Sequence, residues 1–360
     1  MTLNFEENPV LEQRPRLKQA CLKLEQMARD LGPEAKLPTM LELRSQLGVS
    51  LRTLNDAVRE LERGGILRSI NGVGIYVANQ SQTRKTRKLG LLFHRVGSLN
   101  YPYMRDLLTG IRREAARNGL EIMLLDEDTE AVEPGKIDVL IMYCHETEAL
   151  IMDLPSGLPH VLLIRHSPDF TCVAFDDFEG GKAAAQHLLE LGHRRIACLP
   201  SSNSDSISLL RLAGYEAAHQ EAGVTVDKEL VRFLHMSPLK EFRVEGELTM
   251  KSLLENGWEE MGCTAILAHN DESAIGVMQV LANAGIRVPE DVSVVGFDGT
   301  EVSDLCTPRL TTVKVPLMEM GERAVKVLLQ QAREGAGLLE KIVLPVQLKL
   351  GDSAVPRRIG

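Results

Sequence analysis

The stretch that decides the N-terminal fold is Leu37–Val77, which reads LPTMLELRSQLGVSLRTLNDAVRELERGGILRSINGVGIYV. Its first part predicts a short helix that opens at Leu37-Pro38-Thr39 and ends at Gly48, where glycine supplies the left-handed backbone of a tight inter-helix turn. Ser50 then begins a second helix, because its hydroxyl can accept an amide proton of the first turn. The buried face of this second helix is expected to consist of apolar residues at helical spacing, Leu54, Ala57, Val58 and Leu61.

The opposite face of the second helix carries side chains whose lengths and hydrogen-bond donors suit phosphates and base edges in a major groove. These side chains are Arg52, Thr53, Asn55, Arg59 and Arg63. Two short apolar runs, Ile66–Ile70 and Gly74–Val77, then flank the hairpin-turn signal Asn71-Gly72 and predict a wing. An ordinary amphipathic surface helix is the alternative interpretation, and the ordered combination with a wing favours a DNA-binding winged helix.

The N-terminal residues resemble the GntR family over roughly residues 13–79. The resemblance lies in Leu37-Pro38-Thr39, Gly48-Val49-Ser50, Thr53 and Gly72-Val73-Gly74. It implies double-stranded operator DNA as a partner, contacted by Thr39, Ser50, Arg52, Thr53, Asn55, Arg59 and Gly72. The family usually places arginine where this chain has Leu41, Leu51 and Asn55, so the operator sequence stays open.

Length and composition allow two or three domains, since the chain has 360 residues, 44% hydrophobic and 25% charged. No pair of its six cysteines has the C-x-x-C spacing, which argues against a zinc site and a disulfide framework, so neither metal nor cofactor is expected. Met1–Arg14 lacks the apolar core of a secretion signal, and no run of about 18 apolar residues follows. We therefore expect a cytoplasmic protein without a membrane partner.

Charge is divided unevenly along the chain, whose net charge is −9. Residues 1–80 hold 11 basic and 10 acidic groups, residues 81–88 hold four basic groups, and residues 89–360 carry a net charge of −14. Only the N-terminal part suits phosphate binding. The run Arg84–Lys88 either adds phosphate contacts or is a solvated linker. The expected domains are a winged helix over 1–79, a basic linker over 80–88, and an effector-binding and dimerisation domain over 89–360.

From Leu89 onward, short apolar runs without alternation predict strands of parallel sheets buried on both faces. The predicted strands are Leu89–Phe93, Ile122–Leu125, Val139–Met142, Val161–Ile164, Ile196–Leu199, Ala265–Ala268 and Val292–Phe297. The helices expected to cover them are Met104–Asn118, Gly181–Leu191, Arg211–Ala222 and Asp271–Ala284.

Four motifs of this region together resemble the lactose repressor (LacI) family over about residues 88–352: Gly181–Ile196, Arg211–Tyr215, Asn270–Ala274 and Val288–Asp298. The resemblance implies an α/β periplasmic-binding-protein-like domain of two Rossmann-like lobes, joined by three crossing strands, with a ligand in the cleft between them. The whole chain would then combine an N-terminal winged helix-turn-helix (α+β) with this domain, an architecture similar to that of bacterial arabinose repressors.

A small carbohydrate effector is expected in the cleft, because planar and bidentate polar groups at strand ends suit sugar hydroxyls. The residues expected to bind it are Tyr101, His145, Asp177, Arg211, Asn270 and Asp298. Purely structural roles are the alternatives: a turn or cap for Asp298, a helix-start cap for Asn270, and an ion pair with an acidic neighbour for Arg211. Gly299 stands where the family often has an acid or amide, which leaves the effector's identity open.

These observations predict a homodimeric, sequence-specific transcriptional regulator that represses genes of carbohydrate uptake or catabolism and is controlled by a small sugar. We expect no enzymatic activity, since the sequence has no Ser-His-Asp ordering, nucleophile elbow or P-loop. The alternative is a sugar-binding or transport-associated protein, which accounts for the large body but not for the winged helix. Whether the effector is a sugar or a sugar phosphate, and whether it relieves or promotes DNA binding, stays open.

Overall fold

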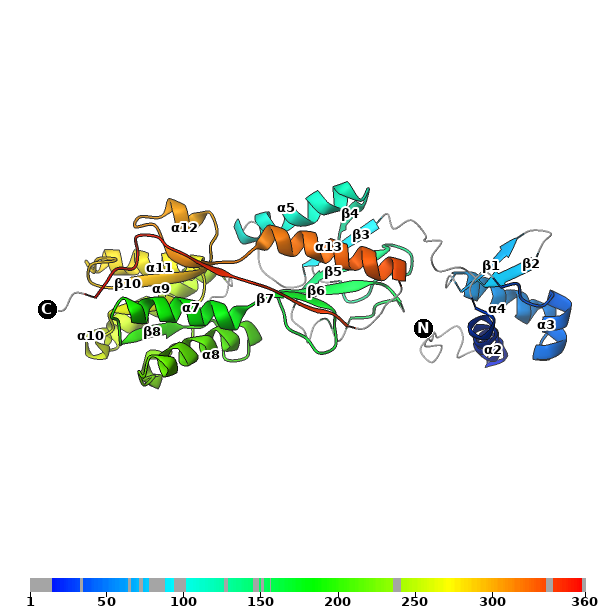
Figure 1. The fold of residues 1–360 in the computed structure, drawn as a ribbon, viewed down its shortest axis with the longest axis horizontal. Coiled ribbons are helices and arrows are strands. Elements are labelled where there is room, and N and C mark those ends of the chain that lie inside the picture. Colours follow the sequence, from blue (N-terminus) through cyan, green and yellow to red (C-terminus); the bar gives the residue numbers. More distant parts are fainter. Residues whose placement is uncertain are drawn as a thin grey trace.

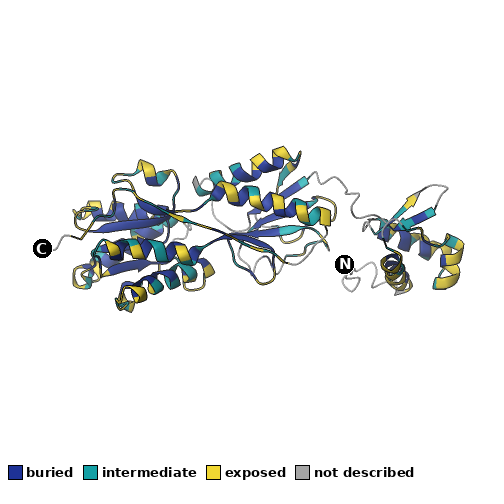
Figure 2. Cartoon of the chain, in the orientation of Figure 1, coloured by how far each residue is buried: buried dark blue, intermediate teal, exposed yellow. Residues whose placement is uncertain are grey.

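The computed structural model describes residues 15–32, 35–63, 66–70, 74–77, 88–93, 102–125, 129–144, 149, 152–155, 157–235, 241–334 and 339–357. Figure 1 shows an N-terminal domain and two lobes, and Figure 2 shows that the strands of the lobes are buried while the outer faces of their helices are exposed. In the part of the chain that is described, no helix is long and apolar enough to cross a membrane.

The N-terminal domain consists of α2 (Pro15–Leu31), α3 (Met40–Leu47), α4 (Leu51–Arg63) and an antiparallel hairpin of β1 (Leu67–Ile70) and β2 (Gly74–Val77). The predicted inter-helix turn is confirmed, because Gly48 ends α3 with a φ of 64° in the left-handed region. The predicted buried face of α4 is confirmed as well. Its Leu54, Ala57 and Leu61 are fully buried in one core with residues of α2.

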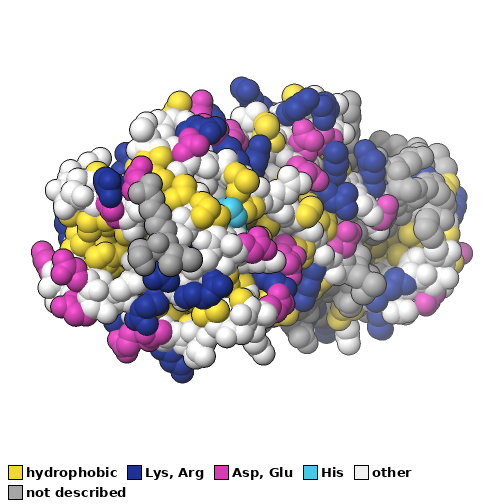
Figure 3. Space-filling view, turned by 60° about the vertical axis from the view of Figure 1, so that its left-hand side comes forward, with side chains coloured by type: hydrophobic (Ala, Val, Ile, Leu, Met, Phe, Trp, Pro, Cys, Tyr) yellow, Lys and Arg dark blue, Asp and Glu magenta, His cyan; other side chains and the backbone are white. Residues whose placement is uncertain are grey.

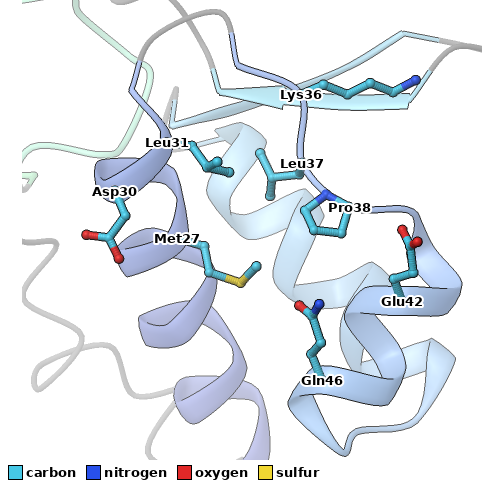
Figure 4. Close-up of a pocket in the computed structure, with 8 residues that line it drawn as sticks. All are labelled: Met27, Asp30, Leu31, Lys36, Leu37, Pro38, Glu42 and Gln46. Carbon is cyan, nitrogen blue, oxygen red and sulfur yellow. The ribbon is translucent and has the colours of Figure 1, made fainter.

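A surface groove of about 540 Å³ lies between the C-terminal end of α2 and the start of α3 (Figure 4). Its lining mixes apolar side chains with both signs of charge: Met27, Asp30, Leu31, Lys36, Leu37, Pro38, Glu42 and Gln46. No residue of α4 lines the groove, so it is separate from the exposed face of that helix.

The first lobe contains a parallel sheet whose described strands lie in the order β12-β7-β6-β5-β3-β4. The strands are β3 (Lys88–Phe93), β4 (Glu121–Leu124), β5 (Val139–Tyr143), β6 (His160–Leu163), β7 (Cys172–Phe175) and β12 (Lys341–Leu344). Helices α5 (Pro102–Arg117) and α13 (Leu317–Glu334) pack side by side against it. The prediction that Ile122–Leu125 is buried on both faces is wrong, because β4 is an edge strand and Leu124 is 57% exposed.

The second lobe contains a sheet of order β13-β11-β10-β9-β8, parallel except for β13. The strands are β8 (Ile196–Leu199), β9 (Ala265–Ala268), β10 (Ser293–Asp298), β11 (Thr311–Lys314) and β13 (Gln347–Lys349). The helical segments are α7 (Asp177–Glu190), α8 (Ser206–Glu221), the 3₁₀ turn η1 (Lys228–Leu230), α9 (Phe242–Glu255), α10 (Trp258–Met261), α11 (Asp271–Asn283) and α12 (Val302–Leu305). Alternate residues of β9 enter separate cores, Leu267 with α7 and α8 and Ile266 with α9 and α11.

The chain passes between the two lobes three times, as the LacI resemblance implies. The described crossings are short: Asp176 between β7 and α7, Val315-Pro316 between β11 and α13, and Pro345-Val346 between β12 and β13. They are held to neighbouring strands, since the Asp176 amide donates to the Leu344 carbonyl (3.0 Å) and the Val315 amide donates to the Asp298 carbonyl (3.1 Å). One hydrophobic cluster runs through both lobes.

The close packing of α7 on α8 depends on two glycines. A Cβ at Gly214 would lie 2.1 Å from the Phe178 carbonyl oxygen, and a Cβ at Gly181 would lie 2.2 Å from the Arg211 carbonyl oxygen. Both contacts are to backbone, which cannot rotate away as a side chain can. The glycines therefore set the distance between the two helices and the position of Arg211 on α8.

Gly214→Ala is expected to destabilise the protein by roughly 1–3 kcal/mol through overpacking. An unobstructed glycine inside a helix would gain roughly 0.5–1 kcal/mol from the same change. Urea unfolding measures the free energy, with Gln186→Ala on the exposed side of α7 as the matched control. A stability equal to or above that of the wild type would contradict the close helix contact.

Candidate functional sites

The exposed face of α4 presents the predicted DNA-contacting side chains. Arg52, Asn55 and Arg59 are exposed and Thr53 is half-buried, on the side of the helix opposite its buried leucines. Arg52 and Arg59 lie seven residues apart, which places them two helical turns apart on one face. This spacing allows both guanidinium groups to reach the same groove of a duplex.

The hydroxyls of Thr39 and Ser50 cap the two helices of the turn. Ser50 Oγ accepts from the Thr53 amide at 3.1 Å, and Thr39 forms a reciprocal capping box with Glu42. Both residues are exposed at helix N-termini, where backbone amides favour a phosphate oxygen. Gly72, the predicted wing contact, lies outside the described residues, although the flanking strands pair as expected.

A second candidate site lies where α8 meets the ends of β9 and β10, and Arg211 is its centre. Arg211 Nε donates to Asp177 Oδ1 at 2.9 Å, and Nη1 donates to the His269 carbonyl at 2.7 Å. Its Nη2 lies 3.9 Å from Asp298 Oδ1, and its guanidinium lies 3.5 Å above the centre of the Phe297 ring. The structure thus brings Arg211, Asp177 and Asp298 together, and it places Asp177 on α7 of the second lobe rather than in the first lobe, where it was expected.

Two carboxylates share this one guanidinium. Asp177 is 1% exposed and Asp298 is 9% exposed. Burial raises the pKa of both carboxyl groups above the ordinary value, and Arg211 opposes the rise. Asp177 Oδ2 has no hydrogen-bond partner among the described residues, so the cluster retains an acceptor that a ligand hydroxyl would satisfy.

The backbone at Asp298 is strained, with a φ of 108°. Such a conformation is rare for residues other than glycine and persists only where the surroundings enforce it. The Asp298 carbonyl accepts from the crossing residue Val315, while its side chain faces Arg211. The strained residue therefore joins the polar cluster directly to a crossing between the lobes.

Asn270 has the capping role that the sequence left as its alternative. Its Oδ1 accepts from the Ser273 amide at 2.9 Å, and the Asn270 amide donates to Ser273 Oγ at 3.0 Å, which closes a capping box on α11. Within the described part, its side-chain nitrogen donates no hydrogen bond. Cap and ligand contact are thus compatible, because they use different atoms of the amide.

Sequence reasoning missed His269, which directly precedes Asn270. Burial and the nearby Arg211 lower its pKa to about 3, so the imidazole is neutral. Its Nδ1 is buried without a hydrogen-bond partner in the described residues, and a cavity of about 20 Å³ beside it has room for a single water molecule. Its position immediately after a predicted strand was the available signal.

The first lobe adds two aromatic side chains to this region, Tyr103 of α5 and Tyr143 at the end of β5. Burial raises the pKa of both phenols, and the charges of Arg211 and Asp298 act on each. Both tyrosines therefore lie near the cluster of the second lobe. Tyr101 and His145, the residues predicted from this lobe, lie outside the described residues.

The ion pair between Arg165 and Asp205 connects the two lobes across the same region. Arg165 follows β6 in the first lobe, Asp205 precedes α8 in the second, and Arg165 Nη1 donates to Asp205 Oδ1. Both side chains are mostly buried, at 16% and 13% exposure. Arg165 stands at a strand end, a signal that the sequence contained and the prediction did not use.

Comparison with known proteins identifies both parts of the chain. The family described as bacterial regulatory proteins, gntR family, matches residues 18–77, and the periplasmic binding protein-like domain family matches residues 185–354. The chain joins a GntR-type helix-turn-helix domain to a periplasmic-binding-protein-like domain of the LacI type. The second match begins later than the predicted LacI resemblance, which started at about residue 88.

Relatives align with most of the length of this chain. The arabinose metabolism transcriptional repressor of Geobacillus stearothermophilus is 27% identical over 325 residues, or 84% of this chain and 87% of that protein. The ribose operon repressor of Escherichia coli strain K12 is 25% identical over 342 residues, or 88% of this chain and 100% of the repressor.

A solved structure supports the two-lobed fold. The crystal structure of a LacI family transcriptional regulator from Enterococcus faecium with bound ribose has a TM-score of 0.64 and 25% sequence identity. The match covers 76% of this chain and all of that one. The predicted α/β domain of two lobes is therefore confirmed.

Arg52→Ala and Arg59→Ala are each expected to weaken DNA binding. The loss should be about 1–3 kcal/mol for an arginine that reads a base, or a decrease of about 1 in the salt slope for one that contacts a phosphate. Fluorescence anisotropy across a salt series distinguishes these effects. The exposed Arg309→Ala of the second lobe is the control, and an equal loss in that variant would contradict a specific role for α4.

Proposed function

We propose that this protein is a transcriptional repressor of carbohydrate uptake or catabolism genes, and that a small sugar bound between its lobes controls its affinity for an operator. One observation carries the proposal: the chain with the exposed Arg52 and Arg59 face also holds the Arg211–Asp177–Asp298 cluster beside the lobe crossings. The relatives named for arabinose metabolism and the ribose operon, and the neighbour with bound ribose, support this function.

Charge supports DNA binding by the N-terminal domain rather than by the lobes. Positive and negative side chains are interspersed on the face of the lobes in Figure 3, and neither sign forms a continuous field. Residues 89–360 carry a net charge of −14. A duplex would therefore find its favourable surface on residues 1–79, with the basic linker 80–88 beside it.

The proposed mechanism couples lobe orientation to operator spacing. A sugar that binds between the lobes favours one lobe arrangement, and in a homodimer assembled through residues 89–360 this changes the spacing of the two recognition helices. A shift from 1:99 to 99:1 between arrangements needs a preference of roughly 10⁴-fold. We propose that binding of the sugar releases the protein from its operator. We place this regulation in the bacterial cytoplasm, where the chromosome lies.

The contacts of the proposed site are residue-specific. Asp298 and Asp177 accept hydroxyl protons, Arg211 and Asn270 donate to ring and hydroxyl oxygens, and Tyr101 and His145 belong to the proposal from the first lobe. These groups bind and orient a polyol, and no nucleophile with an activating base is among them. The protein is therefore proposed to have no enzymatic activity.

The test begins with duplexes that the protein itself selects from a random pool. Titration with pentoses, hexoses and their phosphates is expected to release the selected duplex with one or a few of these compounds. Recovery of that compound unchanged after incubation separates a sensor from an enzyme. Failure to select any duplex at low salt would overturn the proposed function as a transcriptional regulator and would favour a transport-associated binding protein.

Effector affinity is expected to rise with pH. Burial raises the pKa of Asp298 in the free protein, and a hydroxyl that donates to its ionised carboxylate lowers this pKa, so binding releases a proton. Affinity should increase by up to about tenfold per pH unit below the pKa of the free protein. Calorimetry in buffers of different ionisation enthalpy measures the released proton, and Asp298→Asn should reduce the effect to the part that Asp177 contributes. Proton uptake by the wild type would contradict the assigned role.

A further inference from the structure

The N-terminus of α8 has the features of an anion site, yet a carboxylate of the chain already occupies it. Asp205 is the N-cap of this 16-residue helix, and its Oδ2 accepts from the Ser208 amide at 3.2 Å and the Ser208 hydroxyl at 3.0 Å. Its Oδ1 accepts from Arg165 of the other lobe. The helix N-terminus and the guanidinium thus converge on one negative group.

Backbone geometry directs Arg165 to this place. Ile164, the preceding residue, has a φ of 73°, which is an outlier for a β-branched side chain. Its amide nonetheless donates to the Val173 carbonyl at 2.8 Å, which fixes the turn at the end of β6. The strained backbone of Ile164 therefore stands directly before Arg165, whose side chain reaches Asp205 at the start of α8.

The pair is stable as a charged pair. Burial alone would raise the pKa of Asp205, but Arg165 and the Ser208 amide hold it at about 2, so the carboxylate stays ionised at neutral pH. The second guanidinium of the site, Arg211, is bonded to Asp177 and lies near Asp298. In the described part of the site, each of these two arginines is therefore matched by a carboxylate.

We infer that the Arg165–Asp205 pair makes the effector site selective for uncharged polyhydroxyl compounds, such as free sugars, over their phosphate esters. The inference rests on the proposed function and names the chemical class of its effector. A phosphate would have to displace Asp205 or enter without a counter-charge, and like charges brought together in a buried site oppose binding. A hydroxyl needs only the free acceptors and donors already present, such as Asp177 Oδ2 and His269 Nδ1.

Asp205→Asn is the decisive variant, because asparagine caps a helix as well as aspartate while it removes the charge. The probes are matched pairs titrated by calorimetry: D-ribose with D-ribose 5-phosphate, L-arabinose with its 5-phosphate, and D-glucose with D-glucose 6-phosphate. The wild type is expected to bind its best free sugar at least about tenfold more tightly than the phosphate of that sugar. In Asp205→Asn, this ratio is expected to fall by about tenfold.

Further variants separate selectivity by charge from a general change in the fold. Arg165→Gln and the double variant Arg165→Gln/Asp205→Asn are expected to keep the preference for free sugar, because both remove the cation that would hold a phosphate. Asp227→Asn is the matched control, since Asp227 also caps a helical turn and pairs with an arginine, Arg195, but lies on the surface of the second lobe. It should leave the ratio unchanged.

The outcomes distinguish this inference from the proposed function. A phosphate that binds the wild type more tightly than its free sugar would overturn the inference and leave the sugar-controlled repressor intact. An equal gain in phosphate affinity in Asp205→Asn and in the double variant would also overturn it. Binding of neither class, by a protein that still selects a duplex, would overturn sugar control itself and the inference with it.

Discussion

The arrangement of the second lobe's site depends on the buried guanidinium of Arg211. A charge removed from water must be paired and hydrogen-bonded, and Arg211 meets this requirement through Asp177 of α7, the carbonyl that ends β9 and the aromatic ring that precedes Asp298. These groups belong to α7, to β10 and to the residue that directly follows β9, while Arg211 itself is on α8. The requirement to pair one cation therefore holds together the elements that surround the proposed effector position, and Gly181 and Gly214 allow the two helices to approach closely enough.

The need to pair the buried Arg211 guanidinium also connects the site to the junction between the lobes. Asp298 has a strained backbone, faces Arg211, and accepts from the amide of Val315 in one crossing. Packed interfaces change between discrete arrangements more readily than they deform continuously. A ligand that altered the contacts of Asp298 would thus act on a short segment between the lobes, and the Arg165–Asp205 pair also connects the two lobes.

The N-terminal domain does not depend on a buried ion pair in this way. It has a core of its own, formed by α2, α3, α4 and the hairpin. The arginines lie on the exposed face of α4, which does not pack against this core. Within this domain the sequence predicted the two helices of the turn and the hairpin, because caps, turns and helical periodicity are local properties, but it did not predict α2. Gly48 ends the first helix of the turn and Ser50 caps the second, as predicted, since each role depends on neighbours within a few residues.

What the sequence determined by itself was a part of the elements and the motifs: the helix-turn-helix, seven strand segments and the polar residues at strand ends, because these follow from short-range patterns. The tertiary structure alone decided that β4 lies at an edge, that β7, β11, β12 and β13 complete the sheets, and that Arg165 meets Asp205 from the other lobe. It also showed that Asn270 caps α11 while Arg211 pairs with Asp177. Arg211 and Asp177 lie 34 positions apart and Arg165 and Asp205 lie 40 positions apart, and no local pattern of side chains records which distant group will neutralise a buried charge.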